Sequence, residues 1–114
     1  MSKEVEKIAK KQDADPLLFM GENPDENFHA WAKMRIRYDG RFTEKGVEGV
    51  VHVRFYIEPD GRIAIGEVIK SPDEKLSREM IRVIRSSKGK WTPRKVRDVP
   101  QRTAYEYRVN YHNN

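Results

Sequence analysis

The sequence predicts a small α+β domain in which a three-stranded antiparallel sheet carries two helices packed on one face. Three stretches of the chain can be assigned directly from residue patterns. The stretch 46–71 alternates apolar and polar residues across a turn, 71–89 repeats apolar residues at helical spacing, and 102–111 alternates again. A chain of 114 residues can bury one core of modest size.

The strongest signal is a hairpin. Glu58-Pro59-Asp60-Gly61 has turn chemistry, because Pro presets φ and Asp-Gly tolerates a positive φ. In the returning strand the apolar parity slips between Ile65 and Val68, which predicts a bulge near Gly66. The apolar positions on the inner face of this hairpin are Val47, Val51, Val53, Phe55, Ile57, Ile63 and Ile65.

A helix follows the hairpin. Ser71, Pro72 and Glu74 have the spacing of a capping box, with Ser71 as the N-cap and Pro72 at the first helical position. Apolar residues then recur on one helical stripe, which we expect to pack on the apolar face of the hairpin. The helix should end near 86–89. The stripe consists of Leu76, Met80, Val83 and Ile84.

The C-terminal stretch predicts a third strand with one apolar and one polar face. The inward positions are Thr103, Tyr105, Tyr107, Val109 and Tyr111, and the outward positions are Arg102, Ala104, Glu106, Arg108 and Asn110.

Four short patterns occur in a characteristic order. They are G-V-x-G-x-V-x-V-x-F-x-I-x-x-D-G-x-I from Gly46, S-x-x-x-x-L-x-x-E from Ser71, K-W-x-P from Lys90 and P-x-R-x-x-Y from Pro100. In this combination the chain resembles the C-terminal domain of the TonB family, over roughly residues 19–111. The resemblance implies a further helix from Pro24 to Arg37.

In that helix, Asn23 would be the cap, and Phe28, Trp31 and Ala32 the buried side. Tyr38 is followed by Asp39-Gly40 where a Tyr-Pro pair is common, so we expect the connection to the first long strand to be shaped differently.

The family resemblance also implies a function. It points to a periplasmic module of an inner-membrane-anchored energy transducer, which grips the N-terminal TonB box of outer-membrane receptors and so supports import of cargo such as siderophores. The receptor segment would join the C-terminal strand by β-strand addition. Inner-membrane proton-channel partners would be reached through sequence upstream, and an exposed edge also permits a homodimer. The expected peptide-binding residues are Arg102, Thr103, Ala104, Tyr105, Glu106, Tyr107, Arg108 and Val109.

Composition divides the chain into 1–15, expected to be a flexible linker remnant, and 16–114, the domain. The first part carries many charges around a few small apolar residues, whereas Leu17–Met20 is apolar enough to dock on the domain. No run approaches the ~20 apolar residues of a membrane span, so no direct insertion is expected. No hydrophobic signal segment follows Met1, which taken literally indicates a cytosolic protein. The resemblance instead favours the periplasm, with the anchor upstream.

The net charge of +5 is concentrated between Arg85 and Arg102, a stretch that contains seven Lys or Arg residues and a single acidic residue, Asp98. Such a patch can steer acidic partners, although cations also suit a helix C-terminus and a solvated loop. Trp91 within it is either a stacking platform for single-stranded nucleic acid or, as we favour, a core residue. We expect no nucleic-acid partner. The candidate electrostatic contacts are Lys90, Arg94, Lys95 and Arg97.

Catalysis has little support. His29, His52 and His112 lack metal-ligand spacing, and no Gly-rich phosphate loop or nucleophile elbow occurs. We therefore expect no enzyme, no cofactor and no metal. Two alternatives to an energy transducer stay open, a TonB-like sensory or scaffold domain of a larger membrane protein and, less favoured, a small basic nucleic-acid binder.

Overall fold

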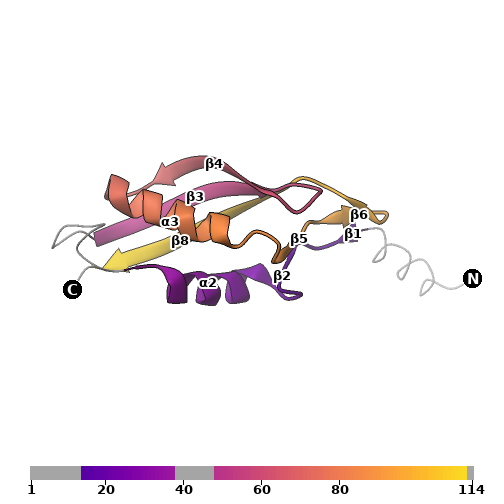
Figure 1. Ribbon diagram of the computed structural model, residues 1–114, viewed down its shortest axis with the longest axis horizontal. Helices are drawn as coiled ribbons and strands as arrows, with labels where there is room; N and C mark the ends of the chain where they lie inside the picture. Colours follow the sequence, from indigo (N-terminus) through magenta and orange to yellow (C-terminus); the bar gives the residue numbers. More distant parts are fainter. Residues whose placement is uncertain (1–13, 38–47, 113–114) are drawn as a thin grey trace, which may run out of the picture.

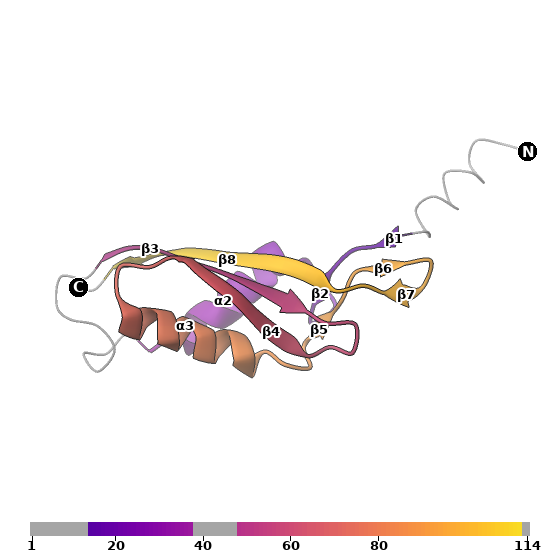
Figure 2. The same cartoon turned by 90° about the horizontal axis from the view of Figure 1, so that it is seen from above.

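A computed structural model describes residues 14–37 and 48–112. Its centre is an antiparallel sheet of three strands in the order β4-β3-β8, where β3 is Glu48–Ile57, β4 is Ile63–Lys70 and β8 is Thr103–His112. The helices α2 (Pro24–Arg35) and α3 (Glu74–Ser86) cover one face of this sheet (Figures 1 and 2). The predicted α+β class and its central sheet are confirmed.

The prediction of one sheet is wrong in one respect, because two small sheets extend the fold. In the first, β2 (Leu18–Phe19) pairs with β5 (Trp91–Thr92). In the second, β6 (Lys95–Val96) pairs with β1 (Ala14–Asp15) and β7 (Val99–Pro100). Strands of two residues are too short to display a period-two pattern, so the sequence did not predict them.

The hairpin β3–β4 forms as its sequence predicts. The Glu58 carbonyl accepts a hydrogen bond from the Gly61 N–H at 2.8 Å, and the Glu58 N–H donates to the Arg62 carbonyl at 2.8 Å. Gly61 has φ +88°, the left-handed conformation that this turn requires. Val51, Val53, Phe55 and Ile57 are all buried on the helix-covered face.

The predicted bulge is confirmed. The register passes from Arg54–Glu67 to Phe55–Ile65, so Gly66 is the extra residue of β4. A Cβ atom there would lie 2.8 Å from the Tyr56 ring and 3.0 Å from the Arg54 carbonyl oxygen, which explains the glycine. A second irregularity skips Ile69.

The cap of α2 is as expected, and its end differs slightly. Asn23 Oδ1 accepts the Asp25 N–H at 2.8 Å, and the helix ends at Arg35, two residues before the predicted end. The predicted buried side, Phe28, Trp31 and Ala32, is confirmed.

The N-cap of α3 was assigned wrongly, because it is Asp73 and not Ser71. Asp73 has an extended backbone and its Oδ1 accepts the Lys75 N–H at 2.6 Å, so Ser71 and Pro72 precede the helix. Asp and Ser are equally favourable N-caps, and here Asp73, two residues after Ser71, takes this position. The Ser71 hydroxyl instead donates to the Asp73 carbonyl at 2.8 Å.

The core lies between the sheet and the two helices. The predicted α3 stripe of Leu76, Met80, Val83 and Ile84 is buried in it. At one end, Phe19 is fully buried and its ring centroid lies 4.8 Å from that of Trp91, so the expected docking of the 17–20 segment is confirmed at Phe19, whereas Met20 is exposed. Trp91 is buried and its Nε1 donates to the Ser87 Oγ at 2.8 Å, which confirms Trp91 as a core residue and not a stacking platform.

The remaining expectations concern segments at or beyond the described residues. Ala14 and Asp15, at the end of the expected linker 1–15, pair with Val96 and Lys95, while 1–13 lie outside the described residues. The connection at Tyr38–Gly40 and the inner-face position Val47 also lie outside them.

Candidate functional site

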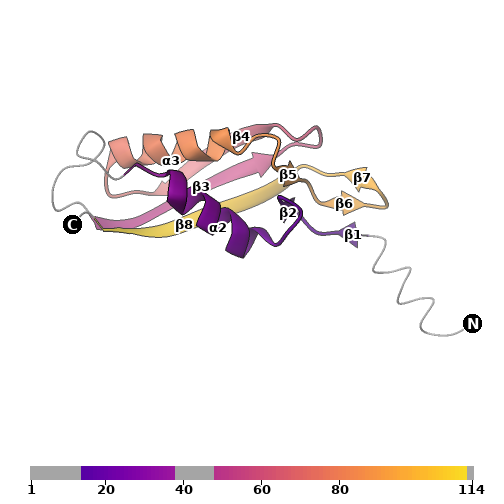
Figure 3. The ribbon, with the colours of Figure 1, turned by 60° about the horizontal axis from the view of Figure 1, so that its bottom comes forward.

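The strand expected to receive a peptide is an edge strand. β8 pairs with β3 through a regular register that runs from Glu48–His112 to Ile57–Thr103 with no irregularity. In the part of the chain that the structure describes, no strand pairs with the other side of β8. Figure 3 shows β8 at the margin of the sheet, with α2 crossing in front of it. A continuous run of backbone groups is therefore available along this margin.

The turn hydrogen bonds establish which backbone groups face this margin. Glu58 directs its N–H toward Arg62 on the β4 side, and successive residues of a strand direct their backbone groups to opposite sides. Odd-numbered residues of β3 therefore face β8, where they lie opposite odd-numbered residues such as Tyr105 and Tyr107. The even-numbered residues of β8 are left with N–H and C=O groups directed outward, namely Ala104, Glu106, Arg108 and Asn110.

The opposite margin of the sheet is less regular. β4 contains both irregularities, at Gly66 and Ile69, and each locally bends the strand and breaks its pairing pattern. Val68 and Ile69 are exposed there. Of the two margins, only that of β8 presents an unbroken ladder.

The structure divides the predicted peptide-binding residues between two faces. Tyr107 and Val109 are buried in the core, and Thr103 and Tyr105 are half-buried on the same face. The side chains of Arg102, Ala104, Glu106 and Arg108 are exposed. The core side chains hold the strand in place, while the outward side chains flank any segment added to it.

Charges on the outward face of the sheet are paired across strands. Glu106 lies 2.6 Å from His52 and 3.1 Å from Arg54, and Arg54 lies 2.8 Å from Glu67. Hydrogen bonds from His52 and Arg54 lower the pKa of the Glu106 carboxyl. Sequence reasoning did not identify this network, although the register places His52 and Arg54 near Glu106 on one face.

A second outward contact lies at the start of β8. The Arg102 guanidinium stacks over the Tyr56 ring, 3.8 Å from its centroid, and its Nε donates to Glu58 Oε1 at 2.8 Å. Arg102 is therefore oriented by two residues of the neighbouring strand and its turn.

A family model described as the C-terminal domain of the Gram-negative bacterial TonB protein matches residues 34–112. The chain belongs to the TonB C-terminal domain family. A search of curated proteins found no match. A search of solved structures found none either. Domains of this family are non-enzymatic protein-interaction modules that are periplasmic in TonB proteins and contact outer-membrane receptors.

In this TonB C-terminal domain, the predicted electrostatic residues are not gathered at the β8 margin. Lys90 precedes β5, Lys95 lies in β6, and Arg94 and Arg97 are exposed beside them. The β6–β7 hairpin that carries Lys95 projects beyond the end of the central sheet (Figure 1). Arg94 alone reaches the start of β8, because its N–H donates to Thr103 Oγ1 at 3.0 Å.

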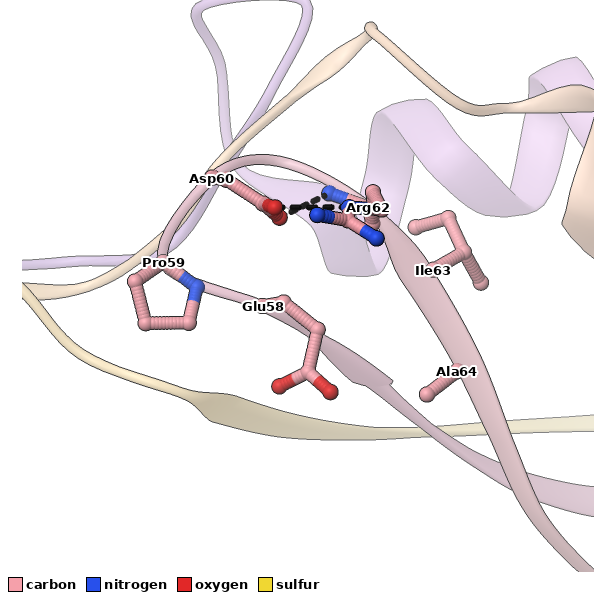
Figure 4. A pocket seen from close by; sticks show the side chains of 6 residues that line it. All are labelled: Glu58, Pro59, Asp60, Arg62, Ile63 and Ala64. Carbon is pink, nitrogen blue, oxygen red and sulfur yellow. Dashed lines mark hydrogen bonds and ion pairs between the residues drawn. The ribbon is translucent and has the colours of Figure 1, made fainter.

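The TonB domain also has an open hollow beside the β3–β4 turn, lined by Glu58, Pro59, Asp60, Arg62, Ile63 and Ala64 (Figure 4). The Arg62 side chain lies 2.6 Å from Asp60, and hydrogen bonds from the Arg62 N–H and guanidinium lower the pKa of Asp60. This pair stabilises the turn.

Residues 14–37 and 48–112 contain no group of three His, Cys, Asp or Glu placed to hold a metal ion. Neither helix among them is long and apolar enough to cross a membrane.

Proposed function

We propose that this chain is the receptor-gripping domain of a TonB-type energy transducer. It takes up the extended TonB box of an outer-membrane receptor as an additional strand along β8, and so supports active import across the outer membrane. The observation that carries the proposal is the regular, outward-facing margin of β8 within a domain of the TonB family. Backbone hydrogen bonds supply affinity in this mode, and flanking side chains supply selectivity.

The geometry of the margin supports strand addition there. Ala104, Glu106 and Arg108 direct backbone groups outward at every second residue, the spacing that an added strand requires. Tyr107 and Val109, which alternate with these outward residues, are buried and fix this backbone to the core. An edge held in this way is ordered before binding, which reduces the entropy lost on association.

The proposal includes a direction of force. When a strand is pulled along its own axis, several ladder hydrogen bonds are loaded together, which suits transmission of a pull. The pull would come from an inner-membrane anchor and proton-channel partners reached through sequence upstream of this domain. The periplasm is the compartment in which such a domain can meet a receptor.

Proline substitution on β8 tests the proposal. Ala104→Pro removes an outward N–H, and we expect it to weaken binding of a labelled N-terminal peptide from a receptor of the same organism by more than about tenfold. Ala104→Ser keeps the N–H and should bind nearly as before. Tyr105→Pro removes an N–H that faces β3, and should instead unfold the domain, as seen in a melting curve.

The peptide provides an independent arm of the same test. Two versions of the receptor peptide can be made, one methylated at the odd backbone nitrogens and one at the even. One version should bind and the other should fail, because only alternate N–H groups of an added strand face β8. Amide shifts should cluster on 102–111. Shifts confined to 88–97 would replace strand addition with an electrostatic contact through Lys90, Arg94, Lys95 and Arg97.

We also propose that the same margin pairs two copies at high concentration. In antiparallel self-pairing centred on Tyr107, Glu106 of each copy lies opposite Arg108 of the other, which is favourable. Sedimentation should then show a dimer that Glu106→Arg weakens and that the receptor peptide dissociates. A dimer unaffected by the peptide would place self-association elsewhere.

A further inference from the structure

The outer surface of α3 carries a cationic groove with an aliphatic floor. Its first hollow is lined by Arg78, Ile81, Arg82 and Arg85. Its second hollow is lined by Arg62, Ile63, Arg85 and Lys88. Arg85 belongs to both hollows, so they are adjacent and together form what is called here the α3 groove.

Helical geometry sets the length of the groove. Arg78, Arg82 and Arg85 follow one another at spacings of four and three residues, which places them on one side of the helix over about 10 Å. Lys88 lies just beyond the end of α3, in a turn where its N–H donates to the Arg85 carbonyl at 3.2 Å. The β3–β4 turn contributes Arg62 from the other side.

Part of this charge is neutralised and part is not. Arg78 pairs with Glu74, Arg62 pairs with Asp60, and Arg82 is held by the buried carboxylate of Glu79. Among the described residues, no carboxylate lies within ion-pairing distance of Arg85 or Lys88, which are both exposed. The helix dipole favours cations at this end of α3, but it does not account for the aliphatic floor that Ile81 and Ile63 give to the two hollows.

We propose that the α3 groove binds an acidic segment of a partner protein, in which carboxylates alternate with aliphatic side chains. The carboxylates would pair with Arg85 and Lys88, and the aliphatic side chains would enter the hollows over Ile81 and Ile63. A flat anionic bilayer would meet the cations equally well, but it has no side chains to fill two separate hollows. The groove therefore fits a polypeptide better than a membrane surface.

The groove can be occupied together with the β8 margin. α3 packs against β3 and β4, whereas β8 lies on the far side of β3. Figure 2 shows α3 beneath the sheet, and no helix or strand of the described residues lies over its outer side. The proposal therefore adds a second binding surface and does not depend on strand addition at β8.

Binding of a labelled peptide built from Glu-Glu-Leu repeats, measured by fluorescence anisotropy, tests the proposal. We expect Arg85→Glu combined with Lys88→Glu to weaken binding about tenfold or more. Arg94→Glu combined with Arg97→Glu changes the net charge equally on the projecting hairpin, and should weaken binding less than about twofold. Equal losses in the two double variants would show general charge attraction and overturn the proposal.

Two further arms test the hollows and the class of partner. Replacing leucine by serine in the peptide, or Ile81→Ser in the protein, should each weaken binding several-fold, and no change in either would overturn the proposal. The affinity of the protein for vesicles that contain phosphatidylglycerol, measured by cosedimentation, should not exceed its affinity for the peptide. If the protein binds such vesicles but not the peptide, and the Arg85 and Lys88 double variant loses vesicle binding, the groove would be assigned to a membrane surface.

Two controls distinguish loss of binding at the groove from misfolding and from binding at β8. Should the double glutamate variant fail to fold by circular dichroism, Arg85→Gln with Lys88→Gln removes the same charges and is expected to weaken binding in the same direction. Amide shifts caused by the acidic peptide should map to 62–63 and 78–88. Shifts that map instead to 102–111 would show that the peptide adds to β8, and would overturn the α3 groove while leaving the proposed receptor contact intact.

Discussion

The Tyr105 hydroxyl donates a hydrogen bond to Asp25 Oδ1 at 2.9 Å, and this contact joins the edge strand β8 to the first turn of α2. Residues 80 positions apart in the sequence are thus connected at the margin proposed for receptor binding. Burial of the Tyr105 ring, together with the negative charge of Asp25, raises the pKa of its phenol. The raised pKa keeps the hydroxyl protonated, and therefore a donor, at neutral pH.

Loss of this contact should be measurable. Tyr105→Phe should lower the free energy of unfolding by about 1 kcal/mol, because the hydrogen bond is lost and the ring is kept. Asp25→Asn retains an acceptor and should cost less. A double-mutant cycle on denaturant unfolding isolates the pair from the favourable position of Asp25 at a helix N-terminus. A coupling energy near zero would show that the bond contributes nothing to stability.

Glu79 should make stability depend on pH. Burial alone would raise the pKa of its carboxyl, but hydrogen bonds from Arg82 and the Arg37 N–H outweigh burial, and the pKa lies below its ordinary value. A lowered folded-state pKa means that Glu79 stabilises the fold above the pKa of the unfolded chain, and that this contribution is lost as pH falls through the folded pKa.

The measurement is urea unfolding from neutral pH down to about pH 3. Wild-type stability should fall with acidity more steeply than that of Glu79→Gln, which should already be about 1–3 kcal/mol less stable at neutral pH. Parallel pH profiles for the two proteins would contradict this role. Glu74→Gln, at the exposed i,i+4 pair with Arg78, serves as the matched control and should leave the profile almost unchanged.

The register of α3 is tested by its single leucine, Leu76. Leu76 is fully buried between α3 and the sheet, so Leu76→Ala should cost roughly 2–5 kcal/mol. Arg78, two residues away on the exposed side, should tolerate alanine within about 0.5 kcal/mol. Thermal melting compares the two, and an unchanged curve for Leu76→Ala would be inconsistent with this packing.

Gly66 should resist substitution. Gly66→Ala places a Cβ 2.8 Å from the Tyr56 ring and 3.0 Å from a backbone oxygen, and we expect a cost of about 1–3 kcal/mol. Combining it with Tyr56→Ser should recover part of the loss, since the ring contact is removed and the contact with the Arg54 oxygen remains. If the losses of stability in the two single variants simply add in the double variant, the ring contact contributes nothing and the cost of Gly66→Ala comes from the contact with the Arg54 oxygen alone.

Much of this fold follows from local sequence. The alternation along β3 and β8, the Pro-Asp-Gly turn and the stripe of α3 each depend on a repeat that one element carries by itself. The bulge at Gly66 was also readable, because a slip in apolar parity requires an extra residue. The strand proposed to receive the receptor was predicted in the same way.

The tertiary structure decided the relationships between distant segments. The two-residue strands β1, β2 and β5 exist only because partners elsewhere in the chain pair with them, and no local pattern marks them. The choice of Asp73 over Ser71 as cap was a competition between two good caps. Which backbone groups of β8 face outward could be assigned only from a hydrogen bond at the far turn, from the Glu58 N–H to the Arg62 carbonyl. Side-chain alternation reveals the two faces of a strand, but it does not show which backbone groups the neighbouring strand uses. The joining of Arg62 to Arg85 and Lys88 in one groove likewise depends on packing of α3 against β4, a contact that no short stretch of sequence encodes.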